Sequence, residues 1–397
     1  MKILAIETSC DDTGIAVLQA SGSKFQVLSN IVSSQQIHAN YGGVFPMMAK
    51  REHQCNLIPV LTQALKESKL LKNKSLTNFT PLKFVRQFKT VEKILEKENT
   101  LFESVKEFLE TYEKPFDYAQ GKPAIDAIAV TNGPGLEPCL WVGVNFAKVL
   151  SYFWDIPVIP VNHIEAHILV NFLENPKMAF PAISLIVSGG HTQLILVKKV
   201  GSYEIIGETR DDAAGECFDK AARILGLGYP GGPEIARIAA QFQPSTQRLS
   251  ALANPIILPR PMINSKDYDF SFSGLKTAIL YKVRDTKPKI VKSEKFIQEM
   301  CFAVQDAICD VLIKKTLQAA KDYKAKTIIL GGGVSANQEL RKQLVKKVRQ
   351  EIPTTKYLIP NSALSTDNAL MIAIAGYLNK AKKIAWQKLS VDANLRI

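Results

Sequence analysis

The chain opens with a strand–turn–strand pattern that recurs half-way along, and this repeat strongly limits the folds open to it. Apolar runs at residues 2–6 and 15–18 flank a polar turn, and a third run follows near 25–33. Residues 182–197 repeat the arrangement, with the polar turn Ser-Gly-Gly-His-Thr at 188–192 between two apolar runs. Short apolar runs bounded by polar turns are typical of strands in a sheet. Such self-similarity indicates a duplicated domain.

Alternating strands and helices follow each opening, which favours the α/β class over an all-β or all-helical chain. At 397 residues the chain is long enough for two such domains. The spacing of apolar residues predicts helices at 47–68, 139–153, 294–322 and 338–350, and strands at 126–130, 158–161 and 327–330.

The stretch from about 69 to 122 interrupts this alternation and reads as a helical insertion on the surface of the first domain. Apolar residues repeat at helical period over 101–112, and Thr100 followed by Glu103 predicts a capping box at the start of that helix. A second helix is expected just before it, at 91–98.

The charge and composition of the chain limit the kinds of partner and compartment to expect. The net charge of +13 favours a polyanionic partner, nucleic acid before an anionic membrane, although an ordinary solvated basic surface is the alternative. The first residues lead directly into a strand, without a leader or an apolar run long enough to span a membrane, so we expect the cytoplasm. None of the six cysteines forms a Cys-x-x-Cys pair, so neither a disulfide framework nor a structural zinc site is expected.

The sequence His-Ile-Glu-Ala-His at 163–167 is a candidate metal clamp. His163 and His167 are four residues apart, so on a helix they share one face and can reach one ion. Glu165 lies about 200° around the helix from either histidine and points away, unlike the glutamate of the zinc-protease pattern His-Glu-x-x-His. Two ordinary helix histidines are the alternative.

Acidic residues elsewhere can complete the clamp. Asp367, in Ser-Thr-Asp-Asn before the last expected helix, is the natural third ligand, although local sequence alone favours the alternative that it only caps that helix. Asp11 and Asp12 in the first polar turn can hold a metal, orient a substrate, or hydrogen-bond only their own turn.

Two glycine-rich turns have the context of phosphate sites. Ser-Gly-Gly at 188–190 and Gly-Gly-Gly at 331–333 each follow a strand, where backbone N–H groups can approach a phosphate. A plain tight turn explains either alone, but two in one α/β chain favour a nucleotide cleft. Lys276 and Arg210 can contact phosphate or be solvated surface charges.

Together these motifs resemble one family, the bacterial type of tRNA N6-adenosine threonylcarbamoyltransferase, once described as a glycoprotease. The resemblance covers nearly the whole chain except about 69–122. The motifs that carry it occur in the family's order, at 6–13, 163–167, 187–192, 211–220, 229–233, 270–276, 331–337 and 365–368.

The resemblance implies an actin/Hsp70/sugar-kinase-like fold of two duplicated ribonuclease-H-like domains around a nucleotide cleft. We assign the first domain to 1–167, completed by 370–397 and carrying the insertion, and the second to 168–369. The implied enzyme is an acyltransferase. It moves the threonylcarbamoyl group of threonylcarbamoyl-AMP to the N6 amine of the adenosine 3′ to the anticodon, in tRNAs that read codons beginning with A.

The resemblance also implies roles for residues. One divalent ion, iron(II) or else zinc, would be held by His163, His167 and Asp367. Asp11 or Glu7 could assist as a base. The adenylate would be bound by Ile186, Val187, Ser188, Gly189, Gly190, Asp219, Gly232 and Asn337.

Partners and competing functions follow from the same resemblance. The bacterial enzyme works with a paralogous partner subunit and a small ATPase, whereas mitochondrial relatives act as homodimers. The insertion could change that arrangement or be a solvated decoration. A non-catalytic ATP-binding paralogue acting as a partner subunit is the alternative function, which the intact clamp disfavours. A metalloprotease is disfavoured by the placement of Glu165.

Overall fold

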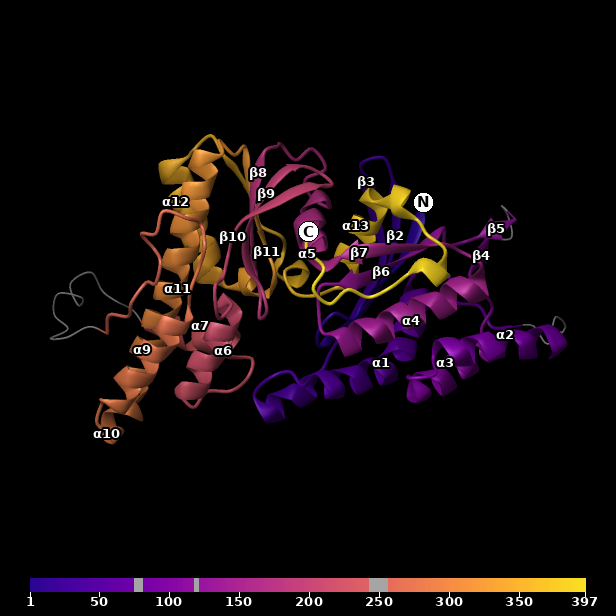
Figure 1. Cartoon of the computed structure of the whole chain (residues 1–397), viewed down its shortest axis with the longest axis horizontal. Coiled ribbons are helices and arrows are strands. Elements are labelled where there is room, and N and C mark those ends of the chain that lie inside the picture. The colour runs from indigo at the N-terminus through magenta and orange to yellow at the C-terminus, as the bar shows by residue number, and fades with distance from the viewer. Residues whose placement is uncertain (75–80, 118–120, 243–255) are drawn as a thin grey trace. The chain divides into compact units, whose positions relative to one another are not determined.

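The computed structural model describes residues 1–74, 81–117, 121–242 and 256–397, and these form two compact units (Figure 1). The first unit consists of Met1–Gln36, Val44–Pro176 and Asp367–Ile397. The second unit consists of Ile37–Gly43 and Lys177–Thr366. Each unit has its own hydrophobic core.

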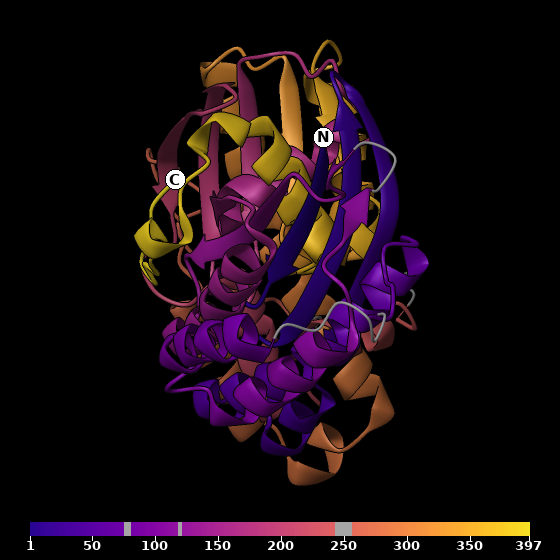
Figure 2. The ribbon, with the colours of Figure 1, turned by 90° about the vertical axis from the view of Figure 1, so that its right-hand side faces the viewer.

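The first unit is built on a five-stranded sheet in the order β3-β2-β1-β6-β7, whose indigo N-terminal strands are drawn at full length in Figure 2. Antiparallel pairing joins β1 to β2 and β2 to β3, whereas β6 and β7 run parallel to β1. The strands are β1 (Lys2–Glu7), β2 (Asp12–Ser21), β3 (Lys24–Ser34), β6 (Ala127–Gly133) and β7 (Val158–Asn162).

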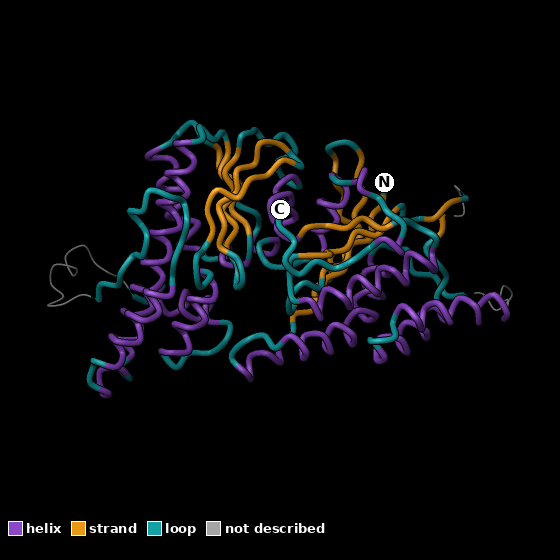
Figure 3. Tube along the Cα trace, viewed as in Figure 1, coloured by secondary structure: helices purple, strands orange, loops and turns teal. Residues whose placement is uncertain are grey.

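The second unit repeats this arrangement in the order β10-β9-β8-β11-β12 (Figure 3). Again the first three strands are antiparallel neighbours, and the last two run parallel to the first strand of the unit. The strands are β8 (Ala182–Val187), β9 (Thr192–Lys199), β10 (Ser202–Glu208), β11 (Thr327–Gly331) and β12 (Lys356–Leu358). The same strand order and directions in both halves confirm the predicted duplication and the predicted α/β class.

Helices cover both faces of the first unit's sheet. Side chains alternate between faces along a strand, and Leu4 and Ile6 of β1 pack into the core with α1 (Pro46–Glu67) and α4 (Glu137–Trp154). The opposite face is covered by α13 (Ala369–Leu378). The approach of α13 is so close that a Cβ on Gly14 would lie 2.9 Å from the backbone nitrogen of Ala369. This glycine therefore lets α13 begin directly above the end of β1.

The insertion forms α2 (Pro81–Ile94) and α3 (Asn99–Thr111), followed by the two-residue strands β4 (Phe116–Asp117) and β5 (Lys122–Pro123). The helix expected at 91–98 ends at Ile94 instead. The expected capping box is also wrong, because the N-cap of α3 is Glu98 and makes no side-chain capping bond. Glu98 is 1% exposed, and its carboxylate is held by Lys50 and Asn145.

Apolar residues of the insertion are continuous with the core of the first unit. Val91, Leu101, Val105 and Phe108 are at most 4% exposed and belong to the same cluster as residues of α1 and α4. The insertion is therefore an integral part of this core, not a decoration attached through polar contacts.

The second unit contains the long helix α11 (Glu294–Asp322), which has the bounds predicted from the sequence. The other α-helices of this unit are α6 (Ala214–Ile224), α7 (Gly231–Ala239), α9 (Ser273–Arg284), α10 (Pro288–Val291) and α12 (Gln338–Glu351). In the structure α6, α7, α10 and α12 pack against α11. Within the described ranges no helix is long and apolar enough to cross a membrane.

Candidate metal centre and nucleotide turns

The two histidines of the predicted clamp lie on α5 (His163–Leu169), which starts where β7 ends. The Asn162 side chain caps this helix by accepting a hydrogen bond from the backbone N–H of Glu165, at 3.0 Å. One helical turn separates His163 from His167, and their ring centroids are 4.7 Å apart. Both are buried, so the helix presents two imidazoles on one face, as the spacing predicts.

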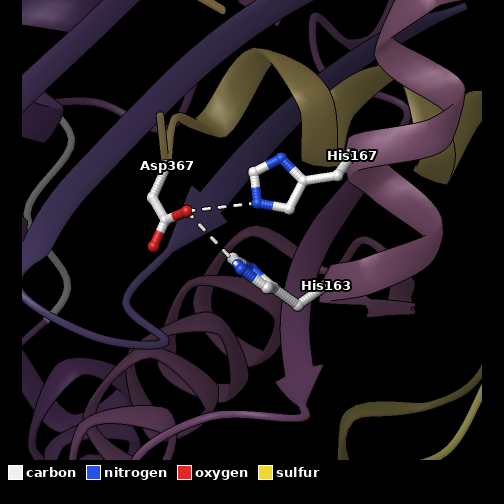
Figure 4. A group of neighbouring side chains, drawn as sticks. All are labelled: His163, His167 and Asp367. Carbon is white, nitrogen blue, oxygen red and sulfur yellow. Dashed lines mark ion pairs between the residues drawn. The ribbon is translucent and has the colours of Figure 1, made fainter. Parts of the chain in front are cut away.

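Asp367 faces both histidines (Figure 4). Its Oδ1 lies 3.5 Å from Nε2 of His163 and 3.2 Å from Nε2 of His167. The alternative that Asp367 caps the last helix is wrong, because Asn368 is the N-cap of α13 and accepts from the N–H of Met371. One donor atom from each of the three residues lies within 4.8 Å of the others, so they form a candidate metal site.

The chemistry of this donor set fits a divalent cation. Imidazole nitrogens with one carboxylate oxygen are ligands that zinc and iron(II) accept, with further positions open to water or substrate. Both ring nitrogens of His167 are buried without a hydrogen bond of acceptable geometry in the described part of the chain. Buried polar atoms without partners are costly, and a bound ion would satisfy Nε2.

Glu7, at the end of β1, holds His163 from its other side. Its carboxylate accepts from the N–H of Ser9 at 2.6 Å and from the Thr131 hydroxyl at 2.7 Å, and lies 3.1 Å from Nδ1 of His163. The Ser9 hydroxyl is 3.2 Å from the same nitrogen. A carboxylate on Nδ1 fixes the ring and leaves Nε2 to face a metal. Sequence reasoning singled out Glu7 as a base and missed this contact.

Burial and the neighbouring carboxylates together set the pKa values of the two histidines. Burial alone would lower the pKa of His163, but the charges of Asp367 and Glu7 outweigh it and raise the pKa to about 9. Burial lowers the pKa of His167. Without an ion, the centre therefore favours one positive charge on His163, between two carboxylates, and a divalent cation would replace that charge.

Two more carboxylates add to this negative region. Burial, followed by the charge of Asp367, raises the pKa of Asp12 to about 7, with smaller contributions from Asp11 and Glu7. Asp11 is half-buried, and its backbone carbonyl accepts from the N–H of Gln35. Asp12 therefore lies within electrostatic range of Asp367, and Asp11 precedes it in the same turn, so the turn adds acidic groups that favour a cation.

Glu165 does not belong to this centre. It is 4% exposed, and its carboxylate lies 4.0 Å from the ammonium of Lys382, in the segment after α13. This contact agrees with the expectation that Glu165 faces away from the histidines, and it removes the residue that a metalloprotease would use as its base.

In the second unit, the two predicted glycine turns pack against each other at the ends of β8 and β11. Gly332 has φ +84°, and a Cβ there would lie 2.4 Å from the carbonyl oxygen of Val187. On the other side, a Cβ on Gly215 would lie 2.5 Å from the carbonyl oxygen of Ser188. Gly189 and Gly190 are exposed, with open space where their Cβ atoms would be. The first turn is therefore held between two glycines and leaves its own glycine backbone accessible.

The remaining predicted adenylate residues have structural contacts of their own. Ile186 and Val187 are fully buried, so only their backbone can face a ligand. Asp219 accepts from the N–H of Gly231 at 2.8 Å. Asn337 caps α12 and donates to Gln305 at 2.9 Å.

Two further residues that the sequence analysis singled out are Gly232 and Arg210. Gly232 is half-buried, with Phe218 as the nearest contact for a Cβ, at 3.9 Å. Arg210, considered as a phosphate contact, is instead engaged by Asp267 at 2.7 Å and by Asp269 at 2.9 Å. Sequence reasoning missed Gly215, whose only signal was its place in the motif at 211–220.

Comparison with known proteins identifies the family. The family model of TsaD, tRNA N6-adenosine threonylcarbamoyltransferase, matches residues 26–76 and 103–374, which leaves residues 77–102, within the helical insertion, unmatched. The protein of this name from Thermosipho africanus is 40% identical, over the full length of both chains. That from Porphyromonas gingivalis is 39% identical over 94% of this chain and 92% of its own. That from Syntrophomonas wolfei is 38% identical over 98% of this chain and 96% of its own. The chain therefore belongs to the tRNA N6-adenosine threonylcarbamoyltransferase family.

Proposed function

We propose that this protein transfers the threonylcarbamoyl group of threonylcarbamoyl-AMP to the N6 amine of the adenosine 3′ to the anticodon, in tRNAs that read codons beginning with A. Full-length similarity to enzymes of that name supports this reaction. The single structural observation that carries it is the intact triad of His163, His167 and Asp367, whose donor atoms lie within 4.8 Å of one another. A non-catalytic partner subunit would have no need for these ligands, so nothing favours that alternative.

Nε2 of His163, Nε2 of His167 and the Asp367 carboxylate would hold the ion, for which we favour iron(II) over zinc. When bound, such an ion supplies Lewis acidity toward the oxygens of the threonylcarbamoyl group. Glu7 would act through His163 by fixing its ring, and we therefore assign it a positioning role.

We assign adenylate binding to the second unit. The exposed backbone N–H groups of Gly189 and Gly190 would donate to the phosphate, in a turn at the end of a parallel-paired strand. The carboxylate of Asp219 would accept from ribose hydroxyls, and Gly232 and Asn337 would border the nucleoside.

The reaction itself needs no covalent enzyme intermediate. The N6 nitrogen attacks the carbamoyl carbonyl carbon, a C–N bond forms, and the bond from that carbon to the phosphate oxygen breaks, so that its electron pair leaves with AMP. The amine loses one proton, for which we propose Asp11 as the acceptor. Burial raises the pKa of the Cys10 thiol, and it raises the pKa of Cys139 to about 12, which argues against a thiolate nucleophile in this region.

For partners, we propose the arrangement of the bacterial enzymes, with a paralogous subunit and a small ATPase, or otherwise a homodimer. Because the substrate is tRNA, we also propose a cytoplasmic location.

The test is transfer to RNA in vitro. Purified protein is incubated with threonylcarbamoyl-AMP and an unmodified anticodon stem-loop, with and without bacterial partner proteins, and the digested nucleosides are analysed by mass spectrometry. We expect threonylcarbamoyladenosine. Product without partners would indicate a self-sufficient homodimer, and product only with them a complex. No product in either case from metal-loaded protein would refute the proposed reaction.

Variants connect the reaction to the triad. His163→Ala and His167→Ala should lose bound metal, measured by elemental analysis, together with activity. Glu165→Gln, on the same helix, is the matched control and should keep both, because Glu165 contacts Lys382. Full metal content in both histidine variants would refute the assigned ligands.

A further inference from the structure

A helical hairpin on the second unit exposes a dense group of positive charges that the proposed chemistry does not use. It consists of the end of α9, a short turn and α10, and we call residues 280–292 the α9–α10 surface. Figure 1 shows α10 at the lower end of this unit, next to the end of α9. Among these 13 residues are five Lys or Arg and one acid, all of them exposed: Lys282, Arg284, Asp285, Lys287, Lys289 and Lys292.

The charges of the α9–α10 surface are largely uncompensated. Asp285 pairs with Arg284 at 2.8 Å, whereas none of the four lysines has an acidic partner within salt-bridge distance among the described residues. The equally basic α12 differs. There Lys342 pairs with Glu339 and Lys347 with Glu351. The lysines of the α9–α10 surface therefore lack the acidic partners that Lys342 and Lys347 of α12 have.

Apolar and aromatic groups lie among these charges. Tyr281 is 49% exposed, and the guanidinium of Arg284 lies 4.5 Å from the centre of its ring. Leu280 and Ile290 are similarly exposed. An exposed tyrosine beside an arginine is the type of platform on which unpaired bases stack, while lysines neutralise the phosphates around it.

The hairpin is held firmly enough to present this platform. On its inner side, Leu275 and Ile279 of α9 are fully buried in the core of the second unit. At its start, Asp211 accepts from the backbone N–H groups of Phe272 and Ser273. The platform is therefore part of an anchored helix. The backbone N–H groups at the start of α9 are already hydrogen-bonded to Asp211.

An anionic membrane would also attract lysines, but the shape of the hairpin disfavours it. Helices that lie in a membrane interface bury a continuous apolar face along their length. Here α10 has a single turn, and the exposed apolar residues are separated by charged ones. RNA is therefore the polyanion that these groups match better.

We propose that the α9–α10 surface binds the tRNA substrate, with Lys287, Lys289 and Lys292 on the phosphate backbone and Tyr281 with Arg284 against an unpaired base. The identity of the RNA rests on the proposed function, whereas the surface itself is defined by exposure, charge and ring geometry.

A pair of charge-matched variants tests the phosphate contacts. The triple variant Lys287→Gln, Lys289→Gln, Lys292→Gln removes three charges from the surface, and Lys342→Gln, Lys346→Gln, Lys347→Gln removes three from α12 of the same unit. Binding of a labelled unmodified tRNA transcript is measured by fluorescence anisotropy over a range of salt, with the partner proteins present or absent. The first triple should weaken binding about tenfold and lower the slope of log Kd against log salt by about 2 to 3.

The control triple should change that slope by less than about 1. Equal losses in both triples, or no loss in the first, would overturn the proposal, as would wild-type protein that binds no tRNA in either setting. Phosphatidylserine vesicles provide the other arm. Vesicle binding that the first triple loses, with tRNA affinity unchanged, would overturn RNA in favour of a membrane.

The stacking contact has its own test. Tyr281→Ala should raise the KM for tRNA about tenfold with kcat unchanged, and Tyr281→Phe, which keeps the ring, should restore the wild-type KM. A change in kcat alone would overturn the assignment. Failure of the proposed function is distinguishable, because it would leave wild-type protein without modified nucleoside while the binding experiment could still be read.

Discussion

At the scale of single residues, the metal centre depends on a carboxylate that touches no metal. Glu7 is fully buried, and it joins His163 to Ser9 and Thr131 by contacts of 2.6 to 3.1 Å. Any rotation of the His163 ring would break the contact with Glu7 and move Nε2 away from Asp367. The orientation of one ligand is therefore set by the end of β1, more than 150 residues away in the sequence.

Glu7→Gln should therefore weaken metal binding without unfolding the chain. An amide keeps the size of the carboxylate but has one acceptor oxygen, so at least one of its three partners loses an acceptor. We expect metal affinity to fall about 10- to 100-fold, measured by competition with a chromogenic chelator. Glu165→Gln, a buried glutamate on the helix of the ligands, is the control and should leave affinity within about twofold. Unchanged affinity in Glu7→Gln would contradict the positioning role.

The residues of the centre could be chosen from the sequence, but their arrangement could not. His163 and His167 follow from helical spacing alone, and that expectation is confirmed. Asp367 could not be separated from a helix cap, because the choice between Asp367 and Asn368 depends on which side chain turns toward α5. Gly215 and Gly332 are needed because other backbone approaches them, and local sequence does not record such an approach.

At the scale of elements, the start of α9 is fixed by one aspartate from another segment. The Asp211 carboxylate accepts from the hydroxyls of Ser271 and Ser273 at 2.6 and 2.8 Å, and from the N–H groups of Phe272 and Ser273. Burial alone would raise the pKa of Asp211, but these hydrogen bonds outweigh it and hold the pKa below its ordinary value. The ionised form is thus stabilised in the folded chain.

The stability that Asp211 contributes should depend on pH with a definite sign. Because the folded pKa is depressed, the contribution is complete above the unfolded value of about 4 and is lost as pH falls through the folded value. Asp211→Asn should be less stable by about 1 kcal/mol at pH 7, since the site is partly exposed to solvent. The difference from wild type should shrink below about pH 4, measured by urea unfolding. A difference that grows in acid would contradict this account.

The inserted helices are held by packing in the hydrophobic core, whereas the start of α9 is held by hydrogen bonds. Phe108 of α3 is 4% exposed and packs in the core shared with α1, where only the helical period was predictable. Phe108→Ala should cost about 3 to 5 kcal/mol of unfolding free energy. The exposed Lys106→Ala on the same helix should stay within about 0.5 kcal/mol. Denaturant unfolding measures both, and equal small effects would show that the insertion is a detachable decoration after all.

At the scale of the whole molecule, the fold was predictable because the same strand–turn–strand pattern occurs at two places in the sequence. The openings at 2–18 and 182–197 are local hairpins, and both become antiparallel strand pairs. The composition of the first unit was less visible, since it gathers three separate chain segments. Its last segment begins at Asp367 and supplies both the third ligand and α13, so the metal centre and the helical cover of one face of the sheet are completed only by this last segment.

A metal ion should accordingly stabilise the first unit and not the second. The ion would connect α5 to the segment that begins at Asp367, and both belong to the first unit. At a free metal concentration 100 times Kd the gain is about 2.7 kcal/mol. Hydrogen exchange of the full chain, with the ion or with a chelator, should show slower exchange in β1 and β6 on loading and no change in β8 and β11. His167→Ala should abolish the difference. Equal slowing in the two sheets would mean that the ion acts on the whole chain, and the assignment of its ligands to one unit would fail.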